Sequence, residues 1–118
     1  MVDDDEAMRH ISSVALARVG EVTTCPDAYL ALAVLRDERV DAVVLDLMMP
    51  GVSGADLLEL LAREGIMRPT VVVTGMGNGP LVDRVRALGA YVLPKPYRPD
   101  ALVAAVERAL ADATPPVA

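Results

Sequence analysis

At 118 residues the chain is long enough for one hydrophobic core and too short for two. Its formal net charge of −6 argues against direct binding to nucleic acid or to an anionic membrane. A single cysteine excludes an intramolecular disulfide, and no apolar segment predicts a signal peptide or a membrane span. We therefore expect a cytoplasmic protein with one folded domain over residues 1–112 and a tail or linker start at residues 113–118.

Short apolar runs alternate with segments of helical periodicity along the chain. This alternation predicts an α/β domain in which βα units form one parallel sheet. The predicted helices cover residues 5–19, 28–37, 54–64, 80–88 and 99–111. The predicted strands cover residues 21–24, 42–46, 70–74 and 91–93. In the first helix, we expect one apolar face made of Met8, Ile11, Ala15, Leu16 and Val19.

The first strand of such a sheet is nearly missing, because only Met1 and Val2 precede the acidic run that begins at Asp3. Three explanations stay open at this point. The chain is shorter than its natural gene product, the strand is very short, or another chain fills the gap.

Polar residues that can carry chemistry follow four of the predicted strands. Asp3 and Asp4 follow the short first strand, Asp46 ends the third, Thr74 ends the fourth and Lys95 follows the fifth. In an open α/β sheet, ligands bind at the carboxyl ends of the strands. We therefore expect these five side chains to meet in one crevice.

The residue types in this predicted crevice suit phosphoryl chemistry. Three carboxylates repel one another unless a cation neutralises them, and Mg²⁺ prefers carboxylate oxygens and shares its shell with phosphate. Lys95 offers a positive charge to a phosphate oxygen, and Thr74 offers a hydroxyl group. Asp46 can then act as a nucleophile and form an aspartyl phosphate.

Four motifs carry a family resemblance: VDDDEAMR at residues 2–9, VLDLMMPGVSG at 44–54, VTG at 73–75 and KPY at 95–97. In order and spacing they resemble the signature of response-regulator receiver domains, similar to chemotaxis regulators. The resemblance implies a flavodoxin-like, doubly wound, five-stranded parallel sheet in the order 2-1-3-4-5, with helices on both faces and a very short or truncated first strand.

The resemblance also implies roles for individual residues. The Lys95–Pro96 peptide bond is expected to be cis. The implied roles are metal binding by Asp3, Asp4, Asp46 and the backbone carbonyl of Met48, phosphoryl acceptance by Asp46, and response to the phosphoryl group by Thr74 and Lys95.

By the same resemblance, the phosphodonor is the phosphohistidine of a histidine kinase or of a histidine phosphotransfer protein. Phosphorylation is expected to change the surface of the fourth helix, fifth strand and fifth helix, which contacts a downstream protein or an output domain. The domain is expected to catalyse only its own phosphorylation and dephosphorylation. Direct nucleic-acid and membrane binding are not expected, and a homodimer stays open.

Two departures from the receiver pattern have consequences. Receivers carry an aromatic residue three positions before the lysine, where this chain has Val92, with Tyr91 one step earlier. Either residue could stand at that position. Met48 and Met76 lie two positions beyond Asp46 and Thr74, and their apolar side chains do not orient water, which predicts slow loss of phosphate.

Two other functions compete with the switch. Haloacid-dehalogenase-like phosphatases also form an aspartyl phosphate, but they place a second Asp where this chain has Met48. A receiver-like interaction module that no longer depends on phosphorylation is the other alternative. His10 is interpreted as a surface residue and Cys25 as a small apolar residue. The glycine-rich segment 75–80 is interpreted as a loop that moves on phosphorylation.

Overall fold

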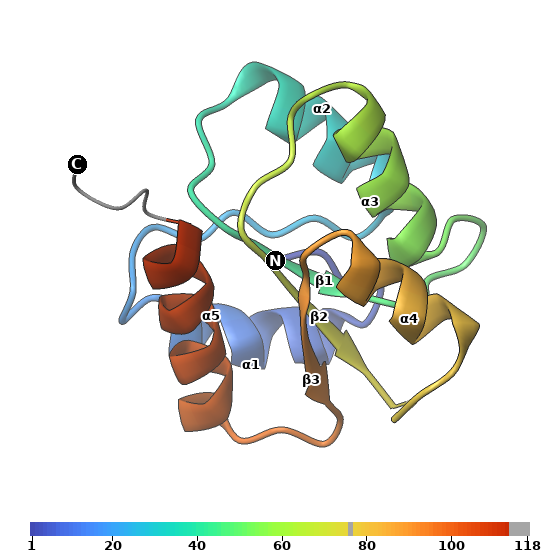
Figure 1. Cartoon of the computed structure of the whole chain (residues 1–118). Helices are drawn as coiled ribbons and strands as arrows, with labels where there is room; N and C mark the ends of the chain where they lie inside the picture. Colours follow the sequence, from blue (N-terminus) through green and yellow to red (C-terminus); the bar gives the residue numbers. More distant parts are fainter. Residues whose placement is uncertain (76, 114–118) are drawn as a thin grey trace, which may run out of the picture.

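The computed structural model describes residues 1–75 and 77–113 (Figure 1). The tail predicted at residues 113–118 falls almost entirely outside these ranges, and its boundary stays a prediction. The helices are α1 (Glu6–Leu16), α2 (Ala28–Asp37), α3 (Gly54–Arg63), α4 (Pro80–Ala87) and α5 (Pro99–Ala113). The strands are β1 (Val43–Asp46), β2 (Thr70–Thr74) and β3 (Tyr91–Pro94).

The sheet is parallel, with the strand order β1-β2-β3. Two further segments extend it beyond β1. Val2 forms a parallel bridge to Leu45 on one side and another to Cys25 on the other. Residues 1–3, here called the N-terminal segment, therefore lie between β1 and residues 21–25. The spatial order of the five segments is the predicted 2-1-3-4-5, although the first two pair through single residues.

The predicted strand at residues 21–24 is wrong in position, because the bridging residue is Cys25. Pairing stops early for a physical reason. The N-terminal segment reaches back only as far as Thr23, whose carbonyl accepts a hydrogen bond from the Met1 ammonium at 2.9 Å. Residues before Thr23 have no neighbouring strand segment to form a ladder with.

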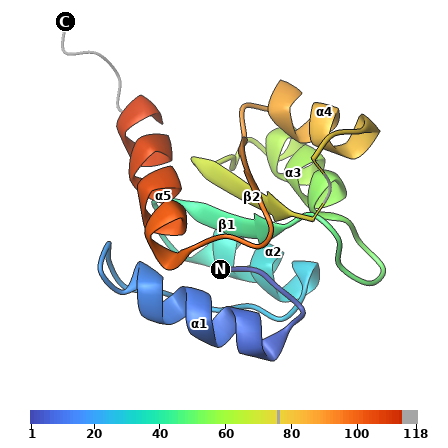
Figure 2. The same cartoon turned by 90° about the horizontal axis from the view of Figure 1, so that it is seen from below.

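Helices cover both faces of the sheet (Figure 2). Buried residues of α2, α3 and α4 pack with Val43, Leu45 and Val72 on one face. Residues of α1 and α5 pack with Val44, Val71 and Val73 on the other face. This doubly wound arrangement explains the unbroken apolar runs of β1 and β2, whose residues are buried on both faces. Within the described ranges, no helix is long and apolar enough to cross a membrane.

The buried face of α1 differs from the predicted one. Ile11 has 52% of its surface exposed, whereas Ser12 is buried. The Ser12 hydroxyl lies 2.7 Å from the hydroxyl of Tyr97, which satisfies its hydrogen-bonding need. Hydrophobic periodicity ranks Ile11 above Ser12 and cannot anticipate a partner 85 residues away.

The connection from β1 to α3 brings backbone segments into close contact at Gly54. Ser53 caps α3, and its hydroxyl accepts a hydrogen bond from the Asp56 amide in a capping box. The amide of Gly54 donates to the Leu47 carbonyl at 2.8 Å. A Cβ atom at Gly54 would lie 2.7 Å from the carbonyl oxygen of Asp46, so this position admits only glycine without a backbone shift.

We expect Gly54→Ala to lower the free energy of unfolding by about 1–3 kcal/mol, since the new methyl group meets backbone atoms that cannot move aside. Gly20→Ala is the matched control, because nothing lies within 4 Å of a Cβ atom there. The control should stay within about 1 kcal/mol of the parent protein. Urea unfolding followed by circular dichroism measures both, and equal losses in the two variants would contradict the steric account.

Candidate functional site

The site is built around Asp46, the last residue of β1. The strand is buried along its whole length, and the Asp46 side chain is 7% exposed. Its Oδ1 atom accepts a hydrogen bond from the Met48 amide at 3.3 Å. The carboxylate is thus held at the carboxyl edge of the sheet, where the loops after neighbouring strands converge.

Asp3 and Asp4 join Asp46 in one acidic cluster. One carboxylate oxygen from each of the three residues lies within 4.8 Å of the others. Asp3 is fully buried, whereas Asp4 is exposed. The structure therefore brings together the three carboxylates that the sequence placed at two separate strand ends.

The Asp3 carboxylate is only partly satisfied. Its Oδ1 atom accepts a hydrogen bond from the Asp5 amide at 2.9 Å. Its Oδ2 atom is buried and has no hydrogen-bond partner in the described part of the chain. Burial raises the pKa of the Asp3 carboxyl above its usual range, and the Asp46 carboxylate adds to the increase. The Asp5 hydrogen bond and Lys95 act in the opposite direction on this pKa.

These features fit a hard divalent cation. All three donors are carboxylate oxygens, the ligand type that Mg²⁺ prefers, and Oδ2 of Asp3 accepts no hydrogen bond from the described residues. A cation would neutralise the mutual repulsion that makes the metal-free cluster unfavourable.

Lys95 supplies the positive charge of the site. Its Nζ atom lies 3.3 Å from Oδ1 of Asp46 and 3.9 Å from Oδ2 of Asp3. The Lys95 amide donates to the Thr74 carbonyl at 2.7 Å, which fixes the loop after β3 to the end of β2. The Lys95–Pro96 bond is cis, as predicted. The Thr74 side chain is buried at the end of β2.

Two supporting interactions escaped the sequence analysis. The Arg9 guanidinium donates to the backbone carbonyl of Asp3 at 2.8 Å. Tyr97, in the loop that carries Lys95, is attached to α1 through its contact with Ser12. Arg9 ends the motif at residues 2–9, but the sequence predicted no role for it, and nothing local indicated the pairing of Ser12 with Tyr97.

Met48 lies beside the cluster, with 54% of its surface exposed. Its amide donates a hydrogen bond to the Asp46 carboxylate. Metal binding by the Met48 carbonyl stays a prediction. Residue 76 lies outside the described ranges, so the expectation for Met76 also stays a prediction.

The structure decides which residue stands at the aromatic position of the receiver pattern. Tyr91 pairs with Val71 at the start of β3 and packs on the α1 and α5 face. Its hydroxyl donates to Asp112, and the Arg108 guanidinium lies 5.8 Å from its ring centre. Because side chains alternate along a strand, Val92 points to the opposite face, toward α4. Tyr91 therefore does not replace the missing aromatic residue, and Val92 occupies its place.

The comparison with known families agrees with this geometry. Residues 1–107 match the family described as "Response regulator receiver domain". The chain belongs to that family. The doubly wound fold and the residues at the carboxyl edge of the sheet are thus those of a receiver domain.

Among its relatives, this receiver is 36% identical to the transcriptional regulatory protein FixJ of Bradyrhizobium diazoefficiens, covering 98% of this chain and 57% of that protein. It is also 36% identical to the DNA-binding transcriptional regulator NtrC of Azospirillum brasilense, covering 100% of this chain and 25% of the relative. The chain therefore spans between a quarter and about three fifths of these relatives.

Solved structures show the same fold. The structure named FixJ-N superposes with a TM-score of 0.84 at 31% identity, covering 97% of this chain and 93% of that one. Chemotaxis protein CheY4 of Vibrio cholerae superposes with a TM-score of 0.84 at 27% identity, covering 92% and 94% of the two chains.

We expect Asp3→Asn to stabilise the metal-free receiver at neutral pH, because the substitution removes a carboxylate whose ionised form burial disfavours. The pKa of Asp3 is higher in the folded state than in the unfolded state. At pH values between these two pKa values, the folded state therefore binds more protons than the unfolded state. Wild-type stability should therefore fall as pH rises through that window, and the variant should lack this component.

Urea unfolding in the presence of a chelator, from acid to neutral pH, measures the effect. Mg²⁺ should stabilise the wild type and not the variant. A variant that is less stable than the wild type at neutral pH would show that Asp3 is not an unfavourable buried charge.

Proposed function

We propose that this receiver is a phosphorylation-controlled switch in which Asp46 accepts the phosphoryl group. The observation that supports this proposal is the convergence of Asp3, Asp4 and Lys95 on the buried Asp46 carboxylate. Family membership supports the same role, since residues 1–107 match the receiver domain of response regulators and the relatives include the regulator FixJ.

In the proposed reaction, a carboxylate oxygen of Asp46 attacks the phosphorus of a phosphohistidine. The new O–P bond gives an acyl phosphate, and the P–N bond to the histidine breaks. The histidine nitrogen leaves and takes up a proton. Bound Mg²⁺, held by Asp3, Asp4, Asp46 and the Met48 carbonyl, would supply charge neutralisation for the phosphoryl oxygens.

Lys95 and Thr74 then respond to the new group. The Lys95 ammonium, now paired with Asp46 and near Asp3, would exchange its carboxylate contacts for a phosphoryl oxygen. The Thr74 hydroxyl would donate to another phosphoryl oxygen. Because the Lys95 amide is bonded to the Thr74 carbonyl, movement of either residue is transmitted to the end of β2 and the loop after β3.

The surface that changes is proposed to be that of α4, β3 and α5. At rest, α4 is joined to α3 by Arg84, whose guanidinium lies 2.7 Å from Glu59 and 3.2 Å from Asp56. Exposed ion pairs of this kind contribute little, so breaking them costs little when α4 changes its position. Val92 has no ring to rotate, which leaves the backbone link between Thr74 and Lys95 as the path of coupling.

The partners follow from this role. The donor is proposed to be a histidine kinase or a histidine phosphotransfer protein in the cytoplasm, and the recipient of the signal a downstream protein or output domain. The domain is proposed to catalyse only its own phosphorylation and dephosphorylation. An acidic chain with a net charge of −6 is poorly suited to bind nucleic acid directly.

We expect Asp46→Asn to abolish formation of the acyl phosphate. Wild-type protein incubated with Mg²⁺ and a small-molecule phosphodonor should gain one phosphoryl group by intact mass, and beryllofluoride should shift the amide resonances of Thr74 and Lys95. Asp83→Asn is the matched control, because Asp83 is an exposed aspartate in the first turn of α4. A folded wild type that gives neither response would instead support a phosphorylation-independent interaction module.

We expect the acyl phosphate to be long-lived, because the exposed thioether of Met48 cannot orient an attacking water molecule. Met48→Gln should shorten its lifetime severalfold by adding a hydrogen-bonding amide at the entrance to Asp46. Met48→Leu, which stays apolar, should leave the lifetime unchanged. Decay of the phosphorylated protein followed by intact mass measures all three, and equal lifetimes for Met48→Gln and Met48→Leu would remove Met48 from the hydrolysis step.

A further inference from the structure

A pair of hydroxyl groups joins α1 to the loop between β3 and α5. The Ser12 side chain is buried, and its Oγ atom lies 2.7 Å from the hydroxyl oxygen of Tyr97. The pair lies beside an apolar groove of about 430 Å³. The apolar side chains that line this groove from the two helices are Met8, Ile11, Ala15 and Leu102. Among apolar side chains an unmade hydrogen bond is costly, so each hydroxyl holds the other in place.

The hydroxyl pair holds one end of the loop that carries Lys95. Lys95 and Tyr97 are two residues apart in this loop, and α5 begins at Pro99. At the other end of the loop, the Lys95 amide donates to the Thr74 carbonyl at 2.7 Å. The backbone at Lys95 is therefore attached to β2 on one side and, through Tyr97, to α1 on the other.

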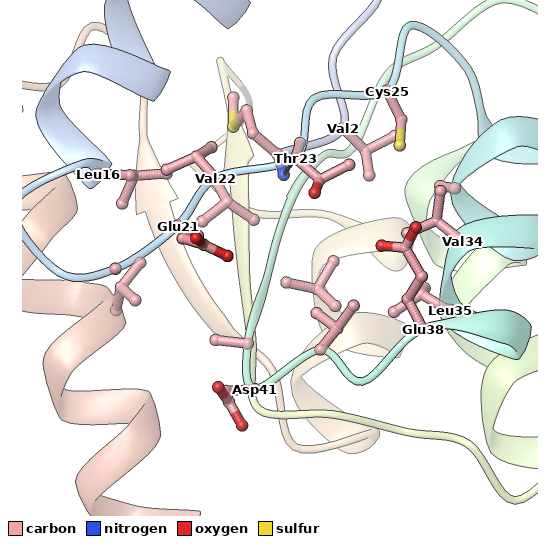
Figure 3. Close-up of a pocket in the computed structure, with 18 of the residues that line it drawn as sticks. Val2, Leu16, Glu21, Val22, Thr23, Cys25, Val34, Leu35, Glu38 and Asp41 are labelled. Carbon is pink, nitrogen blue, oxygen red and sulfur yellow. Dashed lines mark hydrogen bonds between the residues drawn. The ribbon is translucent and has the colours of Figure 1, made fainter.

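The helix that receives Tyr97 is itself held at both ends. At the end of its first turn, the Arg9 guanidinium donates to the Asp3 carbonyl at 2.8 Å. In its last turn, Leu16 is buried and lines the groove at the amino edge of the sheet, between residues 21–25 and the segment that leads into β1 (Figure 3). Ser12 lies between these two attachments, about one turn beyond Arg9. A side chain that is bonded to Ser12 is thus bonded to a well-anchored helix.

Tyr97 also lies within the electric field of the acidic cluster. Burial raises the pKa of its phenol above the usual value, and the Asp3 and Asp46 carboxylates add to the increase. The hydrogen bond with Ser12 and the Lys95 ammonium act in the opposite direction on this pKa. The phenol therefore keeps its proton at neutral pH and remains a hydrogen-bonding partner for Ser12.

We propose that Ser12 and Tyr97 are positioning residues for Lys95. Their hydrogen bond fixes the loop after β3 against α1, so that the Lys95 ammonium stays 3.3 Å from the Asp46 carboxylate, where it meets an incoming phosphoryl group. This role rests on the proposed phosphorylation of Asp46. Both hydroxyls act through Lys95 and not on the phosphoryl group itself.

The chemistry of the pair distinguishes positioning from packing. Alanine at Ser12 and phenylalanine at Tyr97 would leave the apolar contacts in place, and replacing both partners of a buried hydrogen bond with apolar groups is nearly neutral for stability. The apolar pair would lose direction, because a hydrogen bond fixes its donor and acceptor whereas apolar contacts are non-directional. We therefore expect the pair to act on the position of Lys95 more than on the free energy of unfolding.

The first test uses Lys95 as an NMR reporter, because it is the only lysine in the sequence. Protein labelled with ¹³C at lysine gives one ε-methylene group, whose two protons differ in chemical shift when the side chain is held in one conformation. We expect two resolved shifts in the unphosphorylated wild type. Ser12→Ala, Tyr97→Phe and the double variant should each bring the shifts together. Tyr29→Phe, which removes a hydroxyl from a side chain that is 75% exposed, is the matched control and should match the wild type.

The second test measures phosphorylation by a small-molecule phosphodonor with Mg²⁺, followed by intact mass. We expect both single variants and the double variant to react about fivefold more slowly than the wild type, which corresponds to about 1 kcal/mol. The three losses should be equal, because each variant removes the same hydrogen bond. In a Lys95→Ala background, Tyr97→Phe should cause no further loss.

Two results would overturn the proposal. One is an ε-methylene signal of Lys95 that is the same in the wild type and in the variants. The other is a Tyr97→Phe loss of equal size with and without Lys95, which would assign Tyr97 to packing alone. Urea unfolding of each variant checks that it is folded. The lysine signal is recorded without phosphorylation, so a wild type that accepts no phosphoryl group would contradict the proposed function while this test still gives its own answer.

Discussion

The pairing of Val2 with β1 is the interaction on which both the fold and the site depend. The Val2 amide donates to Val44 at 2.7 Å, and the Val2 carbonyl accepts from the Asp46 amide at 2.9 Å. Each bond contributes only about 1 kcal/mol net. Their geometric consequence is larger, because they fix Asp3 beside Asp46 and make the N-terminal segment an interior part of the sheet.

The resulting site lowers the stability of the metal-free fold. Asp3 is fully buried, one of its oxygens accepts no hydrogen bond from the described residues, and its carboxyl is close to two others. Such a group opposes folding when it is ionised, and only Lys95 and the Asp5 amide partly compensate. Strain of this kind is expected where a protein must bind a cation and a phosphoryl group, since a fully satisfied cluster would have no affinity left for either.

The two ends of the sheet are unequally complete. At the carboxyl edge, the loops after the N-terminal segment, β1, β2 and β3 meet and are linked by Lys95, Thr74 and Tyr97. At the amino edge, residues 21–23 and the segment before β1 face one another across a groove. The β3 strand adds a second asymmetry, because its aromatic residue lies on the α5 face and a valine lies on the face toward α4. The carboxyl edge therefore carries the residues of the receiver pattern, whereas Val92 departs from that pattern on the face toward α4.

The sequence by itself determined the elements whose signals are local. The apolar run of residues 70–74 predicted β2 with its observed bounds, and residues 28–37 predicted α2 in the same way. Strand ends also predicted Asp3, Asp4, Asp46, Thr74 and Lys95 as neighbours, because parallel strands share a carboxyl edge.

Tertiary structure decided whatever depends on partners far apart in the chain. Ser12 is buried because Tyr97 meets it, and Cys25 forms a bridge because Val2 lies between it and Leu45. Tyr91 is excluded from the face of Thr74 by the register of β3 on β2. Hydrophobic periodicity carries information over a few residues, whereas these contacts arise only when separate elements pack together.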